Sequence, residues 1–176
     1  MHFELQKSIE ILERTPVVME YLLRDISSEW AMNNEGEDTF SPYDVIGHLI
    51  HGENTDWMAR MEIILSDKKD KIFVPYDRFA MYEESQGKTL NDLLTEFKMA
   101  RDRNIRILLS KELSDDDLDK TGIHPKFGTV TLRQLLATWT IHDLVHLAQI
   151  SRVMAKQYRE EIGPWLEYIT LVQNKK

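Results

Sequence analysis

The chain has 176 residues, the length of one ordinary domain, and carries 22 lysines and arginines against 30 aspartates and glutamates. The resulting net charge of −8 excludes a general attraction to nucleic acid or to an anionic membrane. There is no cysteine, which excludes disulfides, thiolate metal sites and a cysteine nucleophile. No apolar run approaches the roughly 18–20 residues of a membrane span, and the N-terminus lacks a signal-peptide pattern. We therefore expect a cytoplasmic protein with no nucleic-acid or membrane partner.

The first predicted helix begins at Leu5. Its apolar residues follow one another at steps of three or four, which keeps them on one helical face. They are Leu5, Ile9, Leu12, Pro16, Met19, Leu23 and Ile26. Because a proline inside a helix removes a hydrogen bond, we expect Pro16 to kink this helix or to divide it.

The second predicted helix has a clear start. Ser41 is a candidate N-cap, Pro42 suits the first helical position, and Asp44 stands where a capping partner belongs. The apolar pattern continues to about Leu65, so we expect one uninterrupted helix to that point.

A long connector separates the second helix from the third. It covers residues 67–87, and we expect a short helix around residues 76–84 within it. Thr89 and Asp92 then open the third helix, whose apolar face runs to Leu108.

The fourth helix follows two short elements. The acidic residues 114–119 predict a turn, and the glycines and proline of residues 121–130 predict a loop or small hairpin. Thr131 and Gln134 form a capping box that opens the fourth helix, which we expect to reach about Glu160.

The order of these elements predicts an all-α fold. Gly163 and Pro164 end the fourth helix, and residues 165–172 are predicted to form a short closing helix. Four long amphipathic helices indicate a four-helix bundle with a long crossover between helices two and three. We expect residues 1–176 to form a single domain of this kind.

Two histidines of the fourth helix, His142 and His146, carry the strongest chemical signal. Their four-residue spacing puts the imidazoles about 40° apart, one turn above the other. Helical zinc motifs space their histidine ligands in the same way. The surrounding apolar residues point the pair into the bundle, where each imidazole needs a partner. The pair is therefore either part of a divalent metal site or two core histidines with hydrogen-bond partners.

A stable metal site needs a third ligand, and His48 of the second helix is the best candidate. It lies about 60° beyond the edge of the apolar stripe, on a side shared with Gly52, where a small residue allows close helix approach. His51 is the competitor. For either histidine, a place on the surface or at a dimer face is the more common alternative. We assign no role to His124.

Four polar residues near the predicted site are candidates for chemistry. Glu53 and Asp56 point nearer the apolar stripe than His48 does. Either is suited to be a ligand, a hydrogen-bond acceptor or a general base. Their alternative is a salt bridge to an arginine of the third helix. Asp143 is placed to orient an imidazole N–H, and Gln149 to hold a ligand or to make an ordinary contact between helices. We predict Glu53, Asp143 and Gln149 as catalytic residues.

Two histidine-bearing segments occur in a characteristic order. The first is SPYDVIGHL at residues 41–49, and the second is TLRQLL at residues 131–136 followed by HDLVHLAQI at residues 142–150. These segments resemble the second-helix and fourth-helix motifs of the DinB-like family of four-helix-bundle proteins. Tyr158 with Gly163-Pro164-Trp165 is similar to the tail of one branch. The similarity covers nearly the whole chain, from about Leu5 to Trp165.

The resemblance implies a dimeric bundle that binds a metal, often nickel or zinc, through three histidines. These correspond here to His48, His142 and His146. The family includes transferases that use bacillithiol or mycothiol, which implies a low-molecular-weight thiol as a possible cosubstrate. Because that thiol is a separate small molecule, the absence of cysteine is no objection.

Two functions of different classes follow from these residues. The first is a metal-dependent enzyme, a hydrolase or small-thiol S-transferase, whose divalent metal activates water or a thiol. The second is a non-catalytic dimeric bundle that binds metal or a ligand in a stress response. It predicts a site sealed by bulky residues such as Trp57 and Trp139. In a third reading the histidines are structural and bind no metal.

Overall fold

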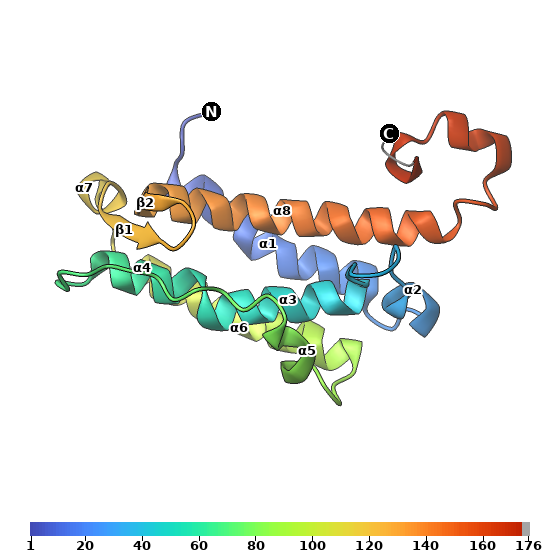
Figure 1. The fold of residues 1–176 in the computed structure, drawn as a ribbon, viewed down its shortest axis with the longest axis horizontal. Helices are drawn as coiled ribbons and strands as arrows, with labels where there is room; N and C mark the ends of the chain where they lie inside the picture. Colours follow the sequence, from blue (N-terminus) through green and yellow to red (C-terminus); the bar gives the residue numbers. More distant parts are fainter. Residues whose placement is uncertain (174–176) are drawn as a thin grey trace.

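Four long helical segments form a bundle in the computed structural model, which describes residues 1–173 (Figure 1). They are α1 (Leu5–Leu23), the successive helices α3 (Pro42–Thr55) and α4 (Trp57–Leu65), α6 (Leu90–Ser110) and α8 (Leu132–Gln157). Both α6 and α8 pack against α1 and against α3, so α1 and α3 occupy opposite corners. α1 and α8 run in one direction, and α3, α4 and α6 run in the other. The predicted all-α four-helix bundle is confirmed.

The starts of three long helices are fixed by the predicted capping boxes. In each box the side-chain oxygen of the N-cap residue accepts the backbone N–H three residues later, and that residue's side chain accepts the N-cap N–H. The pairs are Ser41 with Asp44, Thr89 with Asp92, and Thr131 with Gln134.

The predicted long crossover joins α4 to α6 and runs back along the bundle (Figure 1). It holds one short helix, α5 (Ala80–Glu84). Its first half is anchored to a hairpin, because the Phe73 N–H donates to the Ile123 carbonyl at 2.9 Å and the Ile123 N–H donates to the Lys71 carbonyl at 2.7 Å. The crossover is therefore held against the bundle beside α4.

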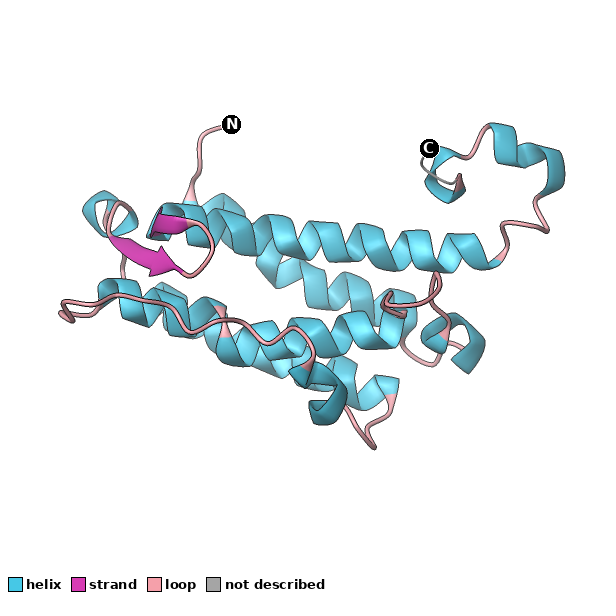
Figure 2. Cartoon of the chain, viewed as in Figure 1, coloured by secondary structure: helices cyan, strands magenta, loops and turns pink. Residues whose placement is uncertain are grey.

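The hairpin consists of strands β1 (Thr121–His124) and β2 (Gly128–Thr131), which pair antiparallel just before α8 (Figure 2). Gly122 allows the crossover to approach closely, since a Cβ atom there would lie 2.4 Å from the Phe73 ring. The predicted loop or small hairpin at this place is thus a hairpin.

The remaining elements are short. α2 (Ser28–Met32) follows α1, and α7 (Asp115–Leu118) forms the predicted acidic turn. After α8 the chain forms two 3₁₀ turns, Gly163–Glu167 and Thr170–Val172. The expected end of the fourth helix at Glu160 is wrong by three residues, because Tyr158 leaves the helical conformation.

Pro16 does not divide the first helix, which continues unbroken from Leu5 to Leu23. A proline has no N–H to donate to the carbonyl four residues earlier, which here is that of Leu12. Arg101 of α6 replaces this donor, since its Nη1 donates to the Leu12 carbonyl at 2.7 Å. A long-range contact therefore satisfies the carbonyl that the proline leaves free.

The second predicted helix is not continuous, and this prediction was wrong. Asp56 has φ −111° and ψ −73°, which separates α3 from α4. Asn104 of α6 donates to the carbonyl of Glu53, in the last turn of α3, at 2.8 Å. This contact supplies a partner to one of the carbonyls that a helix end leaves unpaired.

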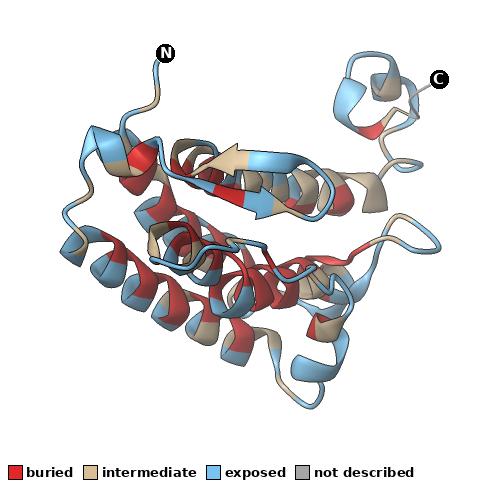
Figure 3. Cartoon of the chain, turned by 60° about the vertical axis from the view of Figure 1, so that its left-hand side comes forward, coloured by how far each residue is buried: buried red, intermediate tan, exposed pale blue. Residues whose placement is uncertain are grey.

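The buried apolar side chains form two clusters along the bundle. Figure 3 shows that the buried residues lie on the helix faces that are turned toward one another. One cluster, around Trp139 and Leu108, fills the end that holds the hairpin, and the other, around Phe97 and Ile46, fills the opposite end. Buried polar residues on α3, α6 and α8 lie between them. Within residues 1–173, no helix combines the length and apolar character needed to cross a membrane.

Candidate metal centre

Three histidine side chains from two helices meet inside the bundle. His48 comes from α3, and His142 and His146 come from α8. The Nε2 atom of His142 lies 3.1 Å from Nε2 of His48 and 3.1 Å from Nε2 of His146. One ligand atom from each ring lies within 4.8 Å of the others. The packing of α3 on α8 thus brings His48 to the pair, although its position lies beyond the apolar stripe of its own helix.

Contacts at the outer ring nitrogens leave two Nε2 lone pairs free. His146 Nδ1 lies 2.8 Å from Gln149 Oε1, and because an amide oxygen only accepts, Nδ1 donates. Nδ1 of His48 lies 3.1 Å from the Tyr76 hydroxyl, which in turn donates to the His48 carbonyl at 3.4 Å. This arrangement is satisfied when Nδ1 of His48 carries the proton. The Nε2 atoms of both rings then face His142 as lone-pair donors.

Burial keeps the three imidazoles neutral. Burial, with a smaller contribution from neighbouring imidazoles, lowers the pKa of His48 to about 3 and that of His142 to about 2. Burial also lowers the pKa of His146. Neutral imidazole is the form that binds a metal ion. These rings are therefore ready to act as ligands at neutral pH.

This set of donors fits a divalent metal. Histidine nitrogens bind zinc at about 2.0–2.1 Å, so neighbouring ligands of one ion lie about 3 Å apart. The two spacings of 3.1 Å agree with that requirement. Three protein ligands leave a position free, which is typical of catalytic rather than closed structural sites.

The competing histidine, His51, does not join the cluster. Its Nδ1 lies 2.9 Å from a carboxylate oxygen of Glu84 on α5. Asp56 is also engaged, since its Oδ1 lies 2.5 Å from Nε of Arg60, one turn on.

Two of the predicted catalytic residues, Glu53 and Asp143, pair with Arg101. Nη2 of Arg101 donates to Glu53 at 2.8 Å, and Nη1 donates to Asp143 at 2.5 Å. Arg101 and Asp143 are 0% exposed and Glu53 is 2% exposed. Glu53 thus forms the salt bridge to an arginine of α6 that was the alternative to a role in the site. Both oxygens of Asp143 accept from the same arginine. The third predicted residue, Gln149, contacts His146. A catalytic role for any of the three stays a prediction.

A cleft of about 420 Å³ opens beside the histidines. Small-molecule sites commonly measure about 300–1,000 Å³, so the cleft has room for a substrate. Its lining combines two histidines of the cluster, His48 and His142, with aromatic and charged side chains. The others are Phe40, Gly52, Asp56, Trp57, Arg60, Tyr76, Arg78 and His124.

Sequence reasoning missed several of these lining residues. Tyr76 and Arg78 belong to the crossover and Phe40 precedes α3, so no helical periodicity assigns them a face. His124, to which we assigned no role, lines the cleft from the hairpin. Trp57 forms part of the wall of the cleft, and Trp139 is fully buried and stacks on Trp57 at 6.0 Å between ring centroids.

The fold and the three-histidine cluster together define a four-helix-bundle protein with a candidate metal site. The sequence profile of the DinB superfamily matches residues 11–150, and the chain belongs to that superfamily. Comparison with curated protein sequences finds no match.

The structure is also similar to that of YfiT from Bacillus subtilis, described as a probable metal-dependent hydrolase with an unusual four-helix bundle topology. The TM-score is 0.71 over 90% of this chain and 87% of YfiT, at 18% sequence identity. At 18% sequence identity, this similarity shows that the two proteins share a fold.

Proposed function

We propose that the protein is a metal-dependent enzyme, a hydrolase or a small-thiol S-transferase, with its divalent metal on His48, His142 and His146. The observation that carries this proposal is that the histidine cluster opens on a cleft of substrate size. A non-catalytic metal-binding bundle predicts instead a site sealed by Trp57 and Trp139. The superfamily membership and the fold shared with YfiT support the same assignment.

The protein's own side chains orient the histidine rings and place a carboxylate beside them. When bound, a divalent metal lowers the pKa of a water or thiol ligand and polarises a substrate carbonyl. Tyr76 and Gln149 fix the rings of His48 and His146 through their outer nitrogens. Asp56 lines the cleft, and burial raises the pKa of its carboxyl group, which places a proton acceptor beside the histidines. Glu53 and Asp143 act at a distance, by holding α3 and α8 together through Arg101.

We propose nickel or zinc as the metal, because imidazole ligands suit both. We also propose that the protein is a homodimer. Apolar side chains are exposed on the neighbouring helices α1 and α8, among them Val18, Tyr21, Ile141 and Val145. Analytical ultracentrifugation tests this, and a single monomeric species at micromolar concentration would contradict it.

Metal content is the first test. Untagged protein purified without a chelator is analysed by inductively coupled plasma mass spectrometry, beside the His142→Ala/His146→Ala variant. We expect about one divalent ion per chain in the native protein and none in the double variant. His124→Ala is the matched control, since this histidine lines the cleft but is not part of the cluster, and it retains the metal.

Activity is tested next on the metal-loaded protein. Ester hydrolysis and transfer of a small thiol to an electrophile are compared between the native protein and the double variant. Turnover that disappears with the metal supports the proposal. If the native protein takes up no metal after incubation with nickel or zinc, the proposal is wrong.

A further inference from the structure

The charges in the cleft differ from those of the whole chain. The chain has a net charge of −8, yet the lining of the cleft contains two arginines, Arg60 and Arg78, against one carboxylate, Asp56. The lining histidines are neutral at pH 7, since burial lowers the pKa of each of them. The protein part of the cleft thus carries one excess positive charge, and a divalent metal adds two more.

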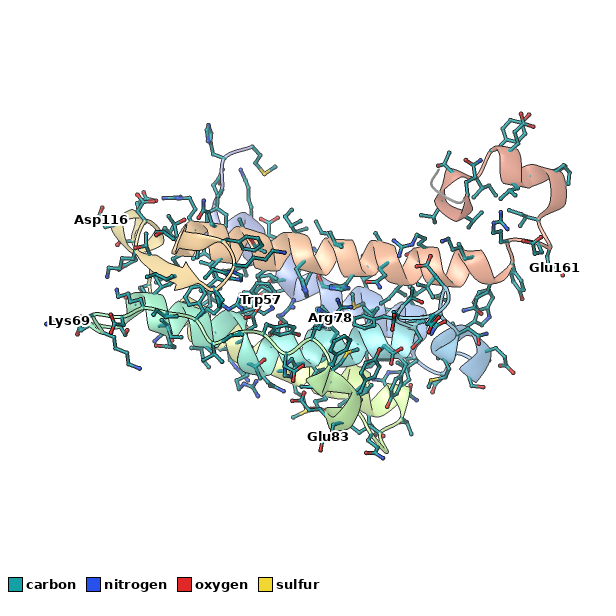
Figure 4. All side chains as sticks on the ribbon, in the orientation of Figure 1. Trp57, Lys69, Arg78, Glu83, Asp116 and Glu161 are labelled. Carbon is teal, nitrogen blue, oxygen red and sulfur yellow. The ribbon has the colours of Figure 1, made fainter. Side chains whose placement is uncertain are left out.

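Arg78 is the source of that excess. Arg60 is paired with Asp56, whereas the residues that the structure describes offer Arg78 no carboxylate within salt-bridge distance. Its guanidinium carbon lies 4.8 Å from the ring centroid of Phe79 and 5.9 Å from that of Phe40. These aromatic contacts hold the cation beside the cleft without neutralising it. Figure 4 shows Arg78 near the middle of the bundle, on the crossover.

His124 supplies a second donor with a fixed tautomer. Its Nδ1 accepts the backbone N–H groups of Lys126 at 3.1 Å and Phe127 at 3.2 Å. Because Nδ1 is an acceptor and the ring is neutral, the proton resides on Nε2. The ring stacks on Phe127 with 4.5 Å between centroids, which fixes its orientation in the hairpin. Among the described residues the Nε2–H has no hydrogen-bond partner, so it is free to donate to a molecule in the cleft.

We propose that the cleft binds a small substrate through an anionic group, a carboxylate or a phosphate, which contacts Arg78, while His124 donates to another acceptor of the same substrate. The reacting part of the substrate then lies toward His48 and His142. A guanidinium binds both kinds of oxyanion through charge-assisted hydrogen bonds. This inference deepens the proposed function and rests on it, because it assigns a substrate class to the same site.

Calorimetric titration of the metal-loaded protein at low ionic strength tests the proposal. The probes are benzoate and phenyl phosphate, with benzamide as the uncharged counterpart of benzoate. We expect one of the two anions to bind at least about tenfold more tightly than benzamide, and the tighter anion identifies the group. Arg78→Gln is expected to weaken that binding about tenfold or more, since it removes both the charge and the charge-assisted hydrogen bonds.

Two further variants make the test specific. Arg78→Lys keeps the charge and is expected to retain part of the affinity. Lys69→Gln removes an exposed cation of the same crossover at the far end of the bundle and is expected to leave binding unchanged (Figure 4). Metal content is measured on every variant.

The outcomes separate this inference from the proposed function. If metal is bound but Arg78→Gln binds the anion as the native protein does, the anion contacts the metal rather than Arg78 and the inference is wrong. Equal binding of benzamide, or binding of neither anion, also overturns it. If no metal is bound, the proposed function falls, and the difference between Arg78→Gln and Lys69→Gln still decides whether the cleft recognises anions.

Discussion

The bundle contains two buried polar clusters on the same helices, and they are built in opposite ways. In the Arg101 cluster, every carboxylate oxygen of Glu53 and Asp143 has a donor, supplied by Arg101, Trp139 or Asn104. Burial alone would lower the pKa of Arg101, but the two carboxylates reverse this effect and raise it. In the histidine cluster, the neutral Nε2 atoms of three rings face one another at 3.1 Å between neighbours.

We therefore expect the Arg101 cluster to stabilise the fold and the histidine cluster to bind a cation. Buried polar groups in proteins are normally paired. In the Arg101 cluster every carboxylate oxygen is paired, and only Nε of Arg101 lacks a partner among the described residues. In the histidine cluster the Nε2 lone pairs of His48 and His146 both face Nε2 of His142, which carries at most one proton. At least one of the two lone pairs therefore lacks a donor from these rings, and a cation supplies a partner. The carboxylates predicted as catalytic lie in the first cluster, whereas Gln149 lies at the second. The contrast is testable by breaking each cluster in turn.

Breaking the Arg101 cluster has the largest expected effect. Arg101→Met leaves two buried carboxylates without their cation and also frees the Leu12 carbonyl beside Pro16. Removal of one partner from a buried ion pair commonly costs about 3–5 kcal/mol, and we expect a loss of that size in the free energy of unfolding. Urea denaturation measures it. Arg103→Met, which removes an exposed contact to Asn54, is expected to cost less than about 1 kcal/mol. Similar values for the two variants would contradict the assigned role.

Acid weakens the histidine cluster in the metal-free protein. The pKa of His48 is about 3 and that of His142 about 2 in the folded state, against about 6.5 in an unfolded chain. Below pH 6.5 the unfolded state therefore binds more protons, and the free energy of unfolding falls as the pH falls. The loss reaches up to about 1.4 kcal/mol per pH unit for each histidine, and it is absent above pH 7.

Urea unfolding at pH 7.5, 6.5 and 5.5 in the presence of a chelator measures this slope. The His142→Ala/His146→Ala variant is expected to show a shallower dependence, since two of the buried rings are gone. Parallel slopes for the two proteins would show that the rings are not held neutral by burial.

Removal of a hydrogen-bond partner of a proposed metal ligand has a smaller expected effect. Gln149→Ala takes away the acceptor of His146 Nδ1 at 2.8 Å, and we expect about tenfold weaker metal binding. Gln149→Glu keeps an acceptor at that position and is expected to restore the affinity. Ser151→Ala, on the exposed side of α8, is the control. Competition with a chromogenic chelator measures all three, and an unchanged affinity in Gln149→Ala would contradict the role assigned to Gln149.

The helix starts and two of the three clustered histidines could be predicted from the sequence. The third histidine could not be chosen with certainty, for a physical reason. Capping boxes and the pair His142 and His146 depend on residues three or four apart, so local geometry predicts them. The choice of His48 over His51 depends on how α3 is rotated against α8, which one helix's periodicity does not determine.

Other features depended on contacts between distant segments. The interruption at Asp56 was missed because the apolar pattern of the second helix continues across it. The roles of Tyr76 and Arg78 depend on where an irregular crossover passes, and no repeating pattern encodes that path. Long-range packing therefore decided which polar residues reached the site.

The smallest expected effect belongs to Tyr76→Phe, which removes the acceptor of His48 Nδ1 but keeps the ring. The bond is 3.1 Å long, against 2.8 Å for that of Gln149. We expect metal binding to weaken about threefold, as the loss of one neutral hydrogen bond worth about 0.5–1 kcal/mol predicts. Tyr82→Phe, which changes an exposed tyrosine of α5, serves as the control in the same chelator assay. A larger loss in Tyr76→Phe than in Gln149→Ala would reverse this order. It would mean that His48 of α3, whose outer nitrogen contacts the crossover, limits the affinity of the site more than the pair on α8.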